Sequence, residues 1–280
     1  MTYVVAAMPL IVLREAIAMA ANRRREQIAE LLQDRRYLTI DALSNKLGVS
    51  SSSVRRDLKV LEEKGLVQLL YGGVVMRKSP LQPYCEREFK CAEEKRAIGQ
   101  RAAQMVKEGD AVIIDAGSTA SQVAHALSRR KDLIDVTVIT PAINVARFFL
   151  DRPSIRVLLS GGELTRENEG MIGRIAEEFF SHVHASAVFL SSVGITPEAG
   201  AMYADHERAA LRGAMVKCAN QVVFIADHSK FGRIAPASGF PIRDIHTLIT
   251  DENASNSALG ALEAFRSRGI AVDVVPIAHP

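Results

Sequence analysis

Cysteine is scarce in this 280-residue chain, and its distribution restricts what the protein can be. The three cysteines, Cys85, Cys91 and Cys218, are an odd number and lack the close spacing of a zinc-binding motif. This pattern argues against a disulfide framework and against a metal site, and it favours a reducing, cytoplasmic compartment. We therefore expect neither a metal ion nor a cofactor.

Long apolar runs are also missing. No run reaches the roughly 18 residues that a membrane-spanning helix requires, so no membrane association is expected. Residues 2–13 are apolar enough to resemble a secretory signal, and the small residues at 18–21 could mimic a cleavage site. However, no basic residue precedes the run, and Arg14 and Glu15 end it early. We interpret residues 1–22 as an extension, with Met19 as the natural start.

Positive charge is unevenly distributed. Residues 23–78 contain 12 Lys and Arg against 7 Asp and Glu, a net charge of +5, whereas residues 79–280 contain 22 against 24, a net charge of −2. A basic N-terminal module on a mildly acidic body fits a protein that contacts the phosphates of DNA. A basic surface of this size is common, so charge alone decides little.

Residues 23–78 have the layout of a winged helix-turn-helix domain. Apolar residues at the i, i+3 and i+4 positions predict a first helix over 24–34. Thr39 is suited to cap a second helix over 40–47, and Gly48 supplies a turn because a positive φ is inexpensive only for glycine. Ser50 is suited to cap a third helix over 51–64. A strand over 66–70 and a turn at Gly72 and Gly73 predict the wing.

The third helix has the properties of a DNA-recognition helix. Its apolar stripe leaves an outer side rich in Ser and Arg, and recognition helices present such N-terminal residues to base edges in the major groove. Arg can donate two parallel hydrogen bonds to guanine. Alternatively, the pattern is that of an ordinary three-helix domain, in which Asp57 pairs with a neighbouring arginine. We expect DNA contacts from Ser51, Ser52, Ser53, Arg55, Arg56, Lys59 and, in the wing, Tyr71.

The run VSSSSVRRDLKVLEEKGLV, followed by YGG, closely resembles the N-terminal domain of DeoR-type bacterial regulators. The resemblance covers residues 23–75 and rests on the Arg-Arg-Asp-Leu core of the third helix, the Leu-Glu and Gly after it, and the Gly-Gly wing. It implies a DNA-binding regulator. The wing departs from the family pattern, because the family tends to carry Arg and His where this chain has Leu69 and Tyr71.

Beyond a proline-containing segment that we interpret as a linker, 79–93, strand and helix patterns alternate over 94–280. Strands are predicted over 111–114, 136–139, 155–159, 187–190, 222–225 and 247–249, and helices over 93–107, 118–127 and 256–268. Apolar strands that alternate with helices predict a mostly parallel sheet covered on both faces, a Rossmann-like α/β domain. No internal repeat or low-complexity tract interrupts it.

Small and polar residues follow several of these strands. In such sheets, ligands bind beyond the carboxyl ends of the strands. Small residues let the backbone approach an anion, a helix N-terminus offers N–H groups, and a lysine supplies a charge for phosphate. Each residue alone is ordinary turn chemistry, but together they predict a phosphate site formed by Asp115, Gly117, Ser118, Thr119, Thr140, Gly161, Gly162, Gly194 and Lys230.

Residues 94–251 resemble the sensor domain of the same DeoR-type family. That domain is related in fold to sugar-phosphate isomerases, so the resemblance implies an α/β fold of the sugar-phosphate isomerase/CoA-transferase type. The matching motifs are Asp115-x-Gly117-Ser118-Thr119, Thr140-Pro141, Gly161-Gly162, Gly194 with a downstream Glu207, and Asp227-x-Ser229-Lys230-Phe231-Gly232. Ser118 stands where the family has Thr, and Pro141 where it has Asn. The resemblance implies that a phosphorylated sugar binds these residues, Glu207 included.

Together these features predict a DNA-binding transcriptional regulator, a repressor of carbohydrate-metabolism genes that is controlled by a phosphorylated sugar. The expected partners are a double-stranded DNA operator, the sugar phosphate and a second copy of the chain, because two recognition helices on one face of DNA require a dimer or tetramer. One alternative is a sugar-phosphate isomerase or deaminase that uses Asp115 and Glu207 as acid and base. Another is an architectural DNA-binding protein whose second domain binds no ligand.

Overall fold

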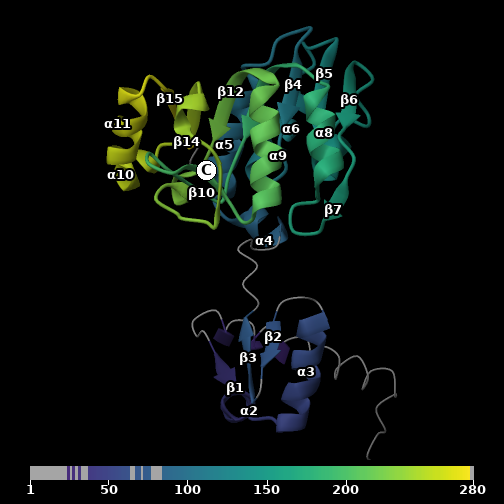
Figure 1. Cartoon of the computed structure of the whole chain (residues 1–280), viewed down its shortest axis with the longest axis vertical. Helices are drawn as coiled ribbons and strands as arrows, with labels where there is room; N and C mark the ends of the chain where they lie inside the picture. The colour runs from purple at the N-terminus through teal and green to yellow at the C-terminus, as the bar shows by residue number, and fades with distance from the viewer. Residues whose placement is uncertain are drawn as a thin grey trace, which may run out of the picture. The chain divides into compact units, whose positions relative to one another are not determined.

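The computed structural model describes residues 24–25, 27–28, 31–32, 37–63, 67–70, 72–76 and 84–277 (Figure 1). The chain divides into two compact units, one within residues 1–79 and one within residues 80–280, and each is described by itself. In the part of the chain that is described, no helix is both long enough and apolar enough to cross a membrane.

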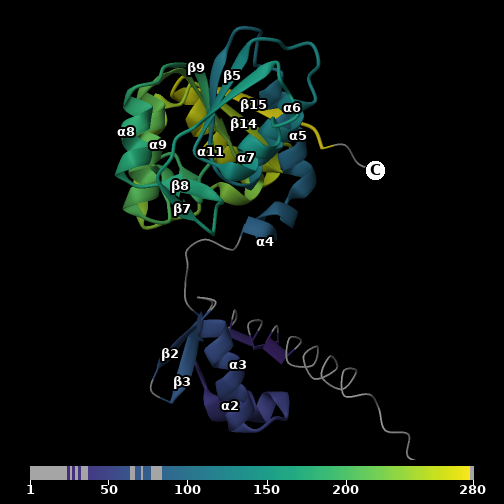
Figure 2. The same ribbon diagram turned by 90° about the vertical axis from the view of Figure 1, so that its right-hand side faces the viewer.

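The first unit is a winged helix-turn-helix (Figure 2). Its sheet has the order β1-β3-β2 with antiparallel neighbours, and Val67 pairs with Met76 at one end of the β2–β3 hairpin. Residues 24–25, 27–28 and 31–32 are helical. The core is formed by fully buried apolar side chains, among them Ile28, Leu43, Val54 and Leu58. The elements are β1 (Leu38–Thr39), α2 (Ile40–Leu47), α3 (Ser51–Glu63), β2 (Val67–Leu70) and β3 (Gly73–Met76).

Local hydrogen bonds place the two helices as the sequence predicts. The Thr39 hydroxyl accepts the backbone N–H of Ala42 at 3.1 Å and caps α2. Gly48 ends α2 in the left-handed conformation, with φ of 64°, which explains why a glycine stands at the turn. The Ser50 hydroxyl accepts the N–H of Ser53 at 3.3 Å at the start of α3. These three positions fix the angle at which α3 leaves the turn.

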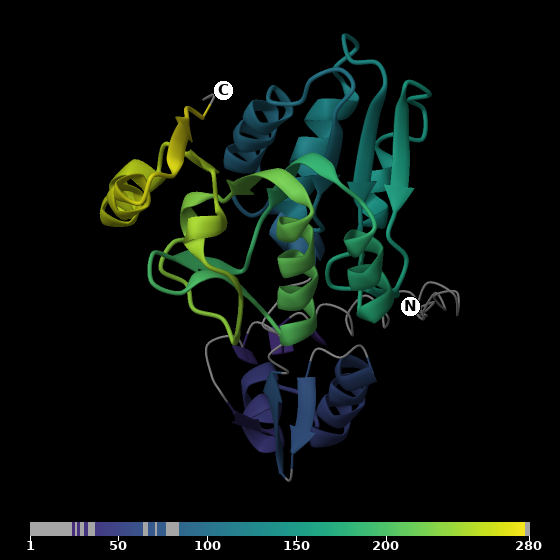
Figure 3. The ribbon, with the colours of Figure 1, turned by 45° about the horizontal axis from the view of Figure 1, so that its top comes forward.

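The second unit is built on a seven-stranded parallel sheet with the order β15-β14-β12-β9-β4-β5-β6 (Figure 3). All six strand pairings are parallel, as expected for a Rossmann-like domain. The strands are β4 (Ala111–Ile114), β5 (Val136–Thr140), β6 (Ile155–Leu159), β9 (Ala185–Leu190), β12 (Ala219–Ile225), β14 (Thr247–Asp251) and β15 (Ala271–Val275).

Helices cover both faces of this sheet, and each face has its own apolar core. Within β4, Val112 and Ile114 pack with the cluster that contains side chains of α5, α6 and α7, whereas Ile113 packs with the cluster of α8, α9 and α11. This alternation follows from the two-residue repeat of a strand. The helices are α4 (Tyr84–Phe89), α5 (Ala92–Ala103), α6 (Ser118–Ser128), α7 (Ile143–Arg147), α8 (Arg174–Ser181), α9 (His206–Lys217), α10 (Ala254–Ser257) and α11 (Leu259–Ser267).

Two small antiparallel sheets and two 3-10 turns complete the unit. They are β7 (Glu163–Thr165) with β8 (Gly170–Ile172), then β10 (Gly194–Thr196), β11 (Gly200–Tyr203) and β13 (Ala237–Phe240), and the turns η1 (His228–Lys230) and η2 (Ile242–Asp244). The sequence did not predict these elements, nor β15, α7, α8 or α9. The helix predicted over 256–268 is two helices, α10 and α11, and α5 ends at Ala103.

The predicted class, a winged helix-turn-helix plus a Rossmann-like α/β domain, is confirmed. The predicted boundaries at 22, 78 and 93 stay predictions. Part of the segment that we expected to be a linker is helical, since Tyr84–Phe89 form α4. This helix proves important for the site.

Candidate functional site

The outer side of α3 carries the cationic residues that the sequence assigned to DNA. Val54 and Leu58 are fully buried, so the helix is fixed by its inner stripe. Arg55, Arg56 and Lys59 are exposed. Among the serines, Ser52 is exposed, and Ser51 and Ser53 are half-buried. The first turns of α3 therefore present hydroxyl and guanidinium donors, as major-groove recognition requires.

Asp57 does not pair with the arginines beside it, which corrects the alternative interpretation of α3. Its carboxylate is 2% exposed and accepts from Arg24 Nε at 2.5 Å and from Arg25 Nε at 3.0 Å. The ion pairs join α3 to the helical residues that precede the domain's first strand. Arg55 and Arg56 remain on the solvent side of the helix.

The wing is joined to α3 by a bond to a side chain and to α2 by a bond between backbone groups. Leu69 N–H donates to Glu62 Oε1 at 2.9 Å, and Ile40 N–H donates to the carbonyl of Gly72 at 3.3 Å. A Cβ on Gly73 would stand 2.5 Å from the ring of Tyr37, so only glycine fits there. Tyr71, the wing residue expected to contact DNA, lies outside the described residues, and its role stays a prediction.

In the second unit, a pocket opens where the carboxyl ends of β4, β9 and β12 meet. The chain extends the sheet in one direction from β4 to β6 and in the other from β9 to β15, so the sheet order reverses between β4 and β9. Ligands of open parallel sheets bind at this kind of reversal. Residues that follow all three strands line the pocket.

The segment after β4 supplies the anion-binding features. Gly117 has φ of 129° and precedes α6, whose first residues are Ser118 and Thr119. A Cβ on Gly117 would lie 3.8 Å from Arg87 Nη1, so glycine leaves the backbone open beside a guanidinium. The first-turn N–H groups and the positive end of the helix dipole face the same space. This arrangement suits a phosphate.

Lys230, which follows β12, lines the opposite part of the pocket. Burial lowers the pKa of its ammonium group to about 8, an effect that the nearby Asp227 carboxylate opposes and that Lys95 reinforces. A bound anion favours the charged form and would raise this pKa again. Burial thus disfavours the charge of Lys230, and a negatively charged ligand would offset that unfavourable free energy.

Two arginines one turn apart on α9 form a further wall. Arg212 is 3% exposed, and its Nη2 lies 2.8 Å from Asp115 Oδ1. Its guanidinium also lies 5.5 Å from the centre of the Tyr203 ring. Arg208 pairs with Asp205 and lies 3.4 Å from Glu167 Oε2. Burial raises the pKa of Asp115 and Arg212 opposes that shift, so the two charges compensate each other and hold the wall in place.

Two buried polar atoms at the pocket have no hydrogen-bond partner among the described residues. They are the hydroxyl of Tyr203 and Nε of Arg208. Burial, together with the charge of Asp115, raises the pKa of Tyr203 well above its usual value, so the hydroxyl remains a neutral donor. Buried donors are nearly always satisfied in native proteins. Both donors belong to residues that line the pocket and are themselves enclosed by protein atoms.

Another wall of the pocket is formed by α4, α5 and the residues between them. Arg87 on α4 donates to the carbonyl of Glu167 at 2.7 Å and to the side chain of Asn168. Lys95 is 2% exposed, and its ammonium donates to the carbonyls of Arg87 and Lys90, which fixes α4 against α5. Arg87, Lys90 and Lys95 all line the pocket. Counting only described residues, seven cationic side chains surround it, the others being Arg208, Arg212, Lys230 and Arg233.

Comparison with known proteins identifies both units. Residues 24–80 match the DeoR-like helix-turn-helix domain, and residues 90–252 match the DeoR C terminal sensor domain. The chain belongs to the DeoR family. It is therefore a DNA-binding transcriptional regulator, as the sequence predicted.

DeoR-family relatives match over most of their length. The chain is 34% identical over 256 residues to the HTH-type transcriptional regulator GolR of Listeria innocua, covering 90% of this chain and 97% of that protein. It is 30% identical over 234 residues to the glycerol-3-phosphate regulon repressor of Escherichia coli, covering 83% and 92%. A ribose 5-phosphate isomerase from Methanocaldococcus jannaschii matches at 15% identity and a TM-score of 0.38, covering 50% of this chain and 55% of that one.

Not every residue that the DeoR motifs suggested lines the pocket. Gly117, Ser118, Thr119 and Lys230 do, whereas Asp115 lies behind Arg212 and supports it. The remaining predicted residues, which lie elsewhere, are Thr140, Gly161, Gly162, Gly194 and Glu207.

The residues outside the pocket have local roles. The Thr140 hydroxyl is buried and accepts the N–H of Ala142 at 3.1 Å. A Cβ on Gly162 would stand 2.6 Å from the carbonyl of Ile172, and a Cβ on Gly194 2.1 Å from the carbonyl of Arg233. These glycines permit close packing of loops.

Gly161 and Glu207 complete the set of predicted residues outside the pocket. Gly161 has φ of 74°, which favours glycine. Glu207 is exposed on α9, next to Arg208. The backbone conformation therefore explains why residue 161 is a glycine, and Glu207 faces the solvent.

The pocket also contains residues that the sequence did not predict. Four of its cationic side chains come from helices and not from strand ends: Arg87 from α4, Lys95 from α5, and Arg208 and Arg212 from α9. A signal existed for two of them: Arg208 and Arg212 are spaced i, i+4 in the helix that Asp205 caps, so they share one face. Arg87 gave no such signal, because it stands in a segment that resembled a linker.

Proposed function

We propose that this regulator represses genes of carbohydrate metabolism and that a phosphorylated sugar in the sensor pocket controls it. The observation that carries the proposal is the convergence of the open N-terminus of α6 with Lys230 and Arg208 around one pocket. The E. coli relative, whose name refers to a glycerol-3-phosphate regulon, supports the same class of effector. We further propose a cytoplasmic protein.

The pocket suggests how binding reaches the DNA-binding domain. Arg87 lies on α4, which falls within the predicted linker, and Lys230 lies on η1; both residues line the pocket. A phosphorylated sugar held by both would fix α4 against the sheet. An effector changes an equilibrium only through different affinities for its two states. We infer that the two states differ in the position of α4.

On the DNA side, the exposed residues of α3 are proposed to read the operator. Arg55 and Arg56 are suited to bases, and Lys59 to the phosphate backbone. Two recognition helices on one DNA face require two-fold symmetry, so the active form is a homodimer or a homotetramer.

The test uses Lys230→Ala in a gel-shift assay with DNA from upstream of the protein's own gene and a panel of sugar phosphates. The variant should bind DNA as the wild type does and lose its response to the effector, because the half-buried positive charge that would bind the phosphate is removed. Arg243→Ala is the matched control, since it removes an exposed cation outside the pocket (side chain 84% exposed). A normal effector response in the Lys230 variant would contradict the assignment of the pocket.

We propose that the domain is not an enzyme. The acid and base expected for isomerase or deaminase chemistry are not brought together, because Asp115 is engaged by Arg212 and Glu207 is exposed outside the pocket. Incubation with ribose 5-phosphate or glucosamine 6-phosphate should give no product. Turnover would overturn this part of the proposal.

The ligand-free alternative is disfavoured by the seven cationic side chains that line the pocket among the described residues. A sugar phosphate should raise the Tm of the sensor domain, since any ligand that binds only the folded state stabilises it. A panel that leaves Tm unchanged would favour the ligand-free alternative.

A further inference from the structure

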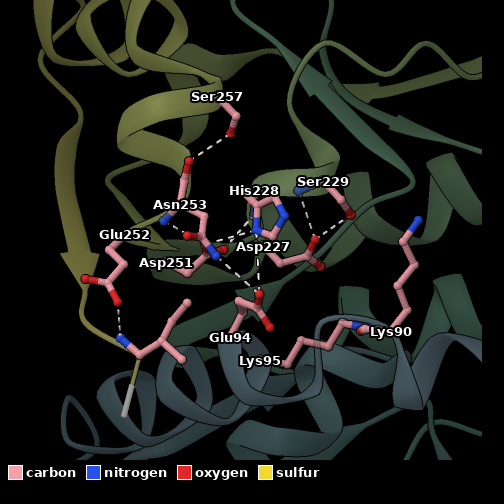
Figure 4. Close-up of polar contacts among 11 residues, drawn as sticks. Lys90, Glu94, Lys95, Asp227, His228, Ser229, Asp251, Glu252, Asn253 and Ser257 are labelled. Atoms are coloured by element: carbon pink, nitrogen blue, oxygen red, sulfur yellow. Dashed lines mark hydrogen bonds and ion pairs between the residues drawn. The ribbon is translucent and has the colours of Figure 1, made fainter. Parts of the chain in front are cut away.

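A cluster of metal-ligating side chains lies beside the pocket, where the N-terminal end of α5 meets η1. Figure 4 shows two of its members, Glu94 and His228. Cys91 precedes α5, Glu94 lies in its first turn, and His228 begins η1. One potential ligand atom from each residue lies within 4.8 Å of those of the other two, and all three residues are half-buried. Their thiol, carboxyl and imidazole groups can therefore approach a single point.

Neighbouring groups hold two of these side chains in place. Asp251 is fully buried, and its carboxylate accepts the backbone N–H of His228 at 2.7 Å and lies 3.0 Å from the Nδ1 atom. Asn253 donates its backbone N–H to the same carboxylate at 3.1 Å and its side-chain amide to Glu94 Oε1 at 3.3 Å (Figure 4). Metal-binding histidines are usually oriented by such a carboxylate.

The local charge favours a cation. Two carboxylates lie close to the imidazole of His228: Glu94 Oε1 is 4.0 Å and Asp251 Oδ1 is 3.0 Å from its Nδ1 atom. The nearest buried cation, Lys95, directs its ammonium at backbone carbonyls. Binding of a metal ion by the thiol group would release its proton to solvent.

We propose that Cys91, Glu94 and His228 bind a thiophilic divalent cation of the Zn²⁺ type, with a fourth position open to water. Thiolate and imidazole ligands select such ions over Mg²⁺ and Ca²⁺. With metal–ligand bonds of about 2.0–2.3 Å, the ligand atoms must approach one another somewhat more closely than 4.8 Å, which rotation of half-buried side chains allows.

Such a cation would join α5 to η1, the turn that carries Ser229 and Lys230 of the pocket. Cysteine spacing along the chain did not predict the site, because its imidazole is contributed by residue 228 and its other two ligands by residues 91 and 94. The proposal does not depend on which molecule fills the pocket.

The test is a titration of the metal-free, full-length chain with Co²⁺, followed by competition with Zn²⁺. One equivalent of Co²⁺ should produce a thiolate-to-cobalt charge-transfer band in the near ultraviolet, and Zn²⁺ should abolish it. Cys91→Ser should remove the band. Cys218→Ser, which changes a buried thiol elsewhere in the domain, should retain it.

Asp251→Asn provides a second, positioning variant. It should weaken Co²⁺ binding by about 10- to 100-fold, as loss of an orienting partner does at other sites, while the band stays thiolate-like. Circular dichroism checks that each variant is folded. Glu94→Gln, which should also weaken Co²⁺ binding, replaces Cys91→Ser or Asp251→Asn if either variant does not fold. The absence of the band in the wild type, its persistence in Cys91→Ser, or its loss in Cys218→Ser would overturn the proposal.

Discussion

The two units use positive charge in opposite ways. On α3, Arg55, Arg56 and Lys59 are exposed, and the one acid within their run, Asp57, is turned inward to Arg24 and other helical residues. In the sensor pocket, the side chains of Arg208 and Arg212 are 11% and 3% exposed, and each pairs with a carboxylate of the same unit.

This difference follows from the anions that the two surfaces are built for. DNA is a long polyanion, and exposed, mobile cations gain affinity by releasing its counterions. A small phosphorylated molecule offers few charges, so affinity and selectivity require donors that are already fixed and partly desolvated. Burial strengthens the attraction between the pocket cations and a bound anion, and the paired acids compensate for the free energy of desolvating those cations.

The largest effect should come from breaking the buried pair. Arg212→Ala leaves Asp115 uncompensated at 1% exposure, which should lower the free energy of unfolding of the sensor unit by about 3–5 kcal/mol. Urea denaturation followed by circular dichroism measures it. The double variant Arg212→Met with Asp115→Asn should lose less. Equal losses in both would show that the ion pair is not what stabilises this wall.

An exposed arginine should behave in the opposite manner. Arg55→Ala should weaken operator binding by about 1–3 kcal/mol, or roughly 5- to 150-fold, and Arg56→Ala should do the same, because each side chain is suited to contact a base. Stability should change by less than about 0.5 kcal/mol, since the residues are exposed. Fluorescence anisotropy with labelled operator measures the affinity, with Arg243→Ala as the control. Intact binding in both variants would refute the assignment of the recognition helix.

The same contrast explains what the sequence could predict. The α3 surface is local: a cap at Thr39, a glycine turn and an apolar stripe all lie within some twenty-five residues, and each leaves a pattern in the sequence. Six strands of the parallel sheet were equally visible, because strands buried on both faces are continuous apolar runs. The residues that directly follow β4 and β12 could then be placed at one edge of the sheet.

The walls of the pocket could not be predicted in this way. Arg87, Arg208 and Arg212 converge through packing of helices that are distant in sequence, and a lone arginine carries no signal of where it will point. Conversely, Gly162 and Gly194 matched a family motif, but their role is steric, since a Cβ at either position would meet a backbone carbonyl. A motif shows that a residue matters without showing which contact it makes.

The pH dependence of effector binding tests the contribution of a single pocket cation, Lys230. The pKa of Lys230 is lowered to about 8. A bound phosphate favours the charged amine, so affinity should be complete below pH 8 and fall by up to about tenfold per pH unit above it. Isothermal titration calorimetry between pH 7 and 10 measures this decline. Lys230→Arg should abolish it, because arginine stays charged. A flat profile in the wild type would mean that Lys230 does not face the ligand.

The smallest effect should come from the cap that places the recognition helix. Thr39→Ala removes the hydroxyl that accepts the Ala42 N–H, at an exposed helix end, and should lower the stability of the DNA-binding unit by about 1 kcal/mol, whereas Thr39→Ser should restore most of it. Thermal unfolding of both variants measures the difference. Effector binding should not change in either, because Thr39 belongs to the other unit. A loss of effector affinity in Thr39→Ala would contradict this expectation. It would mean that the stability of the DNA-binding unit and effector binding in the sensor pocket are energetically coupled even without DNA.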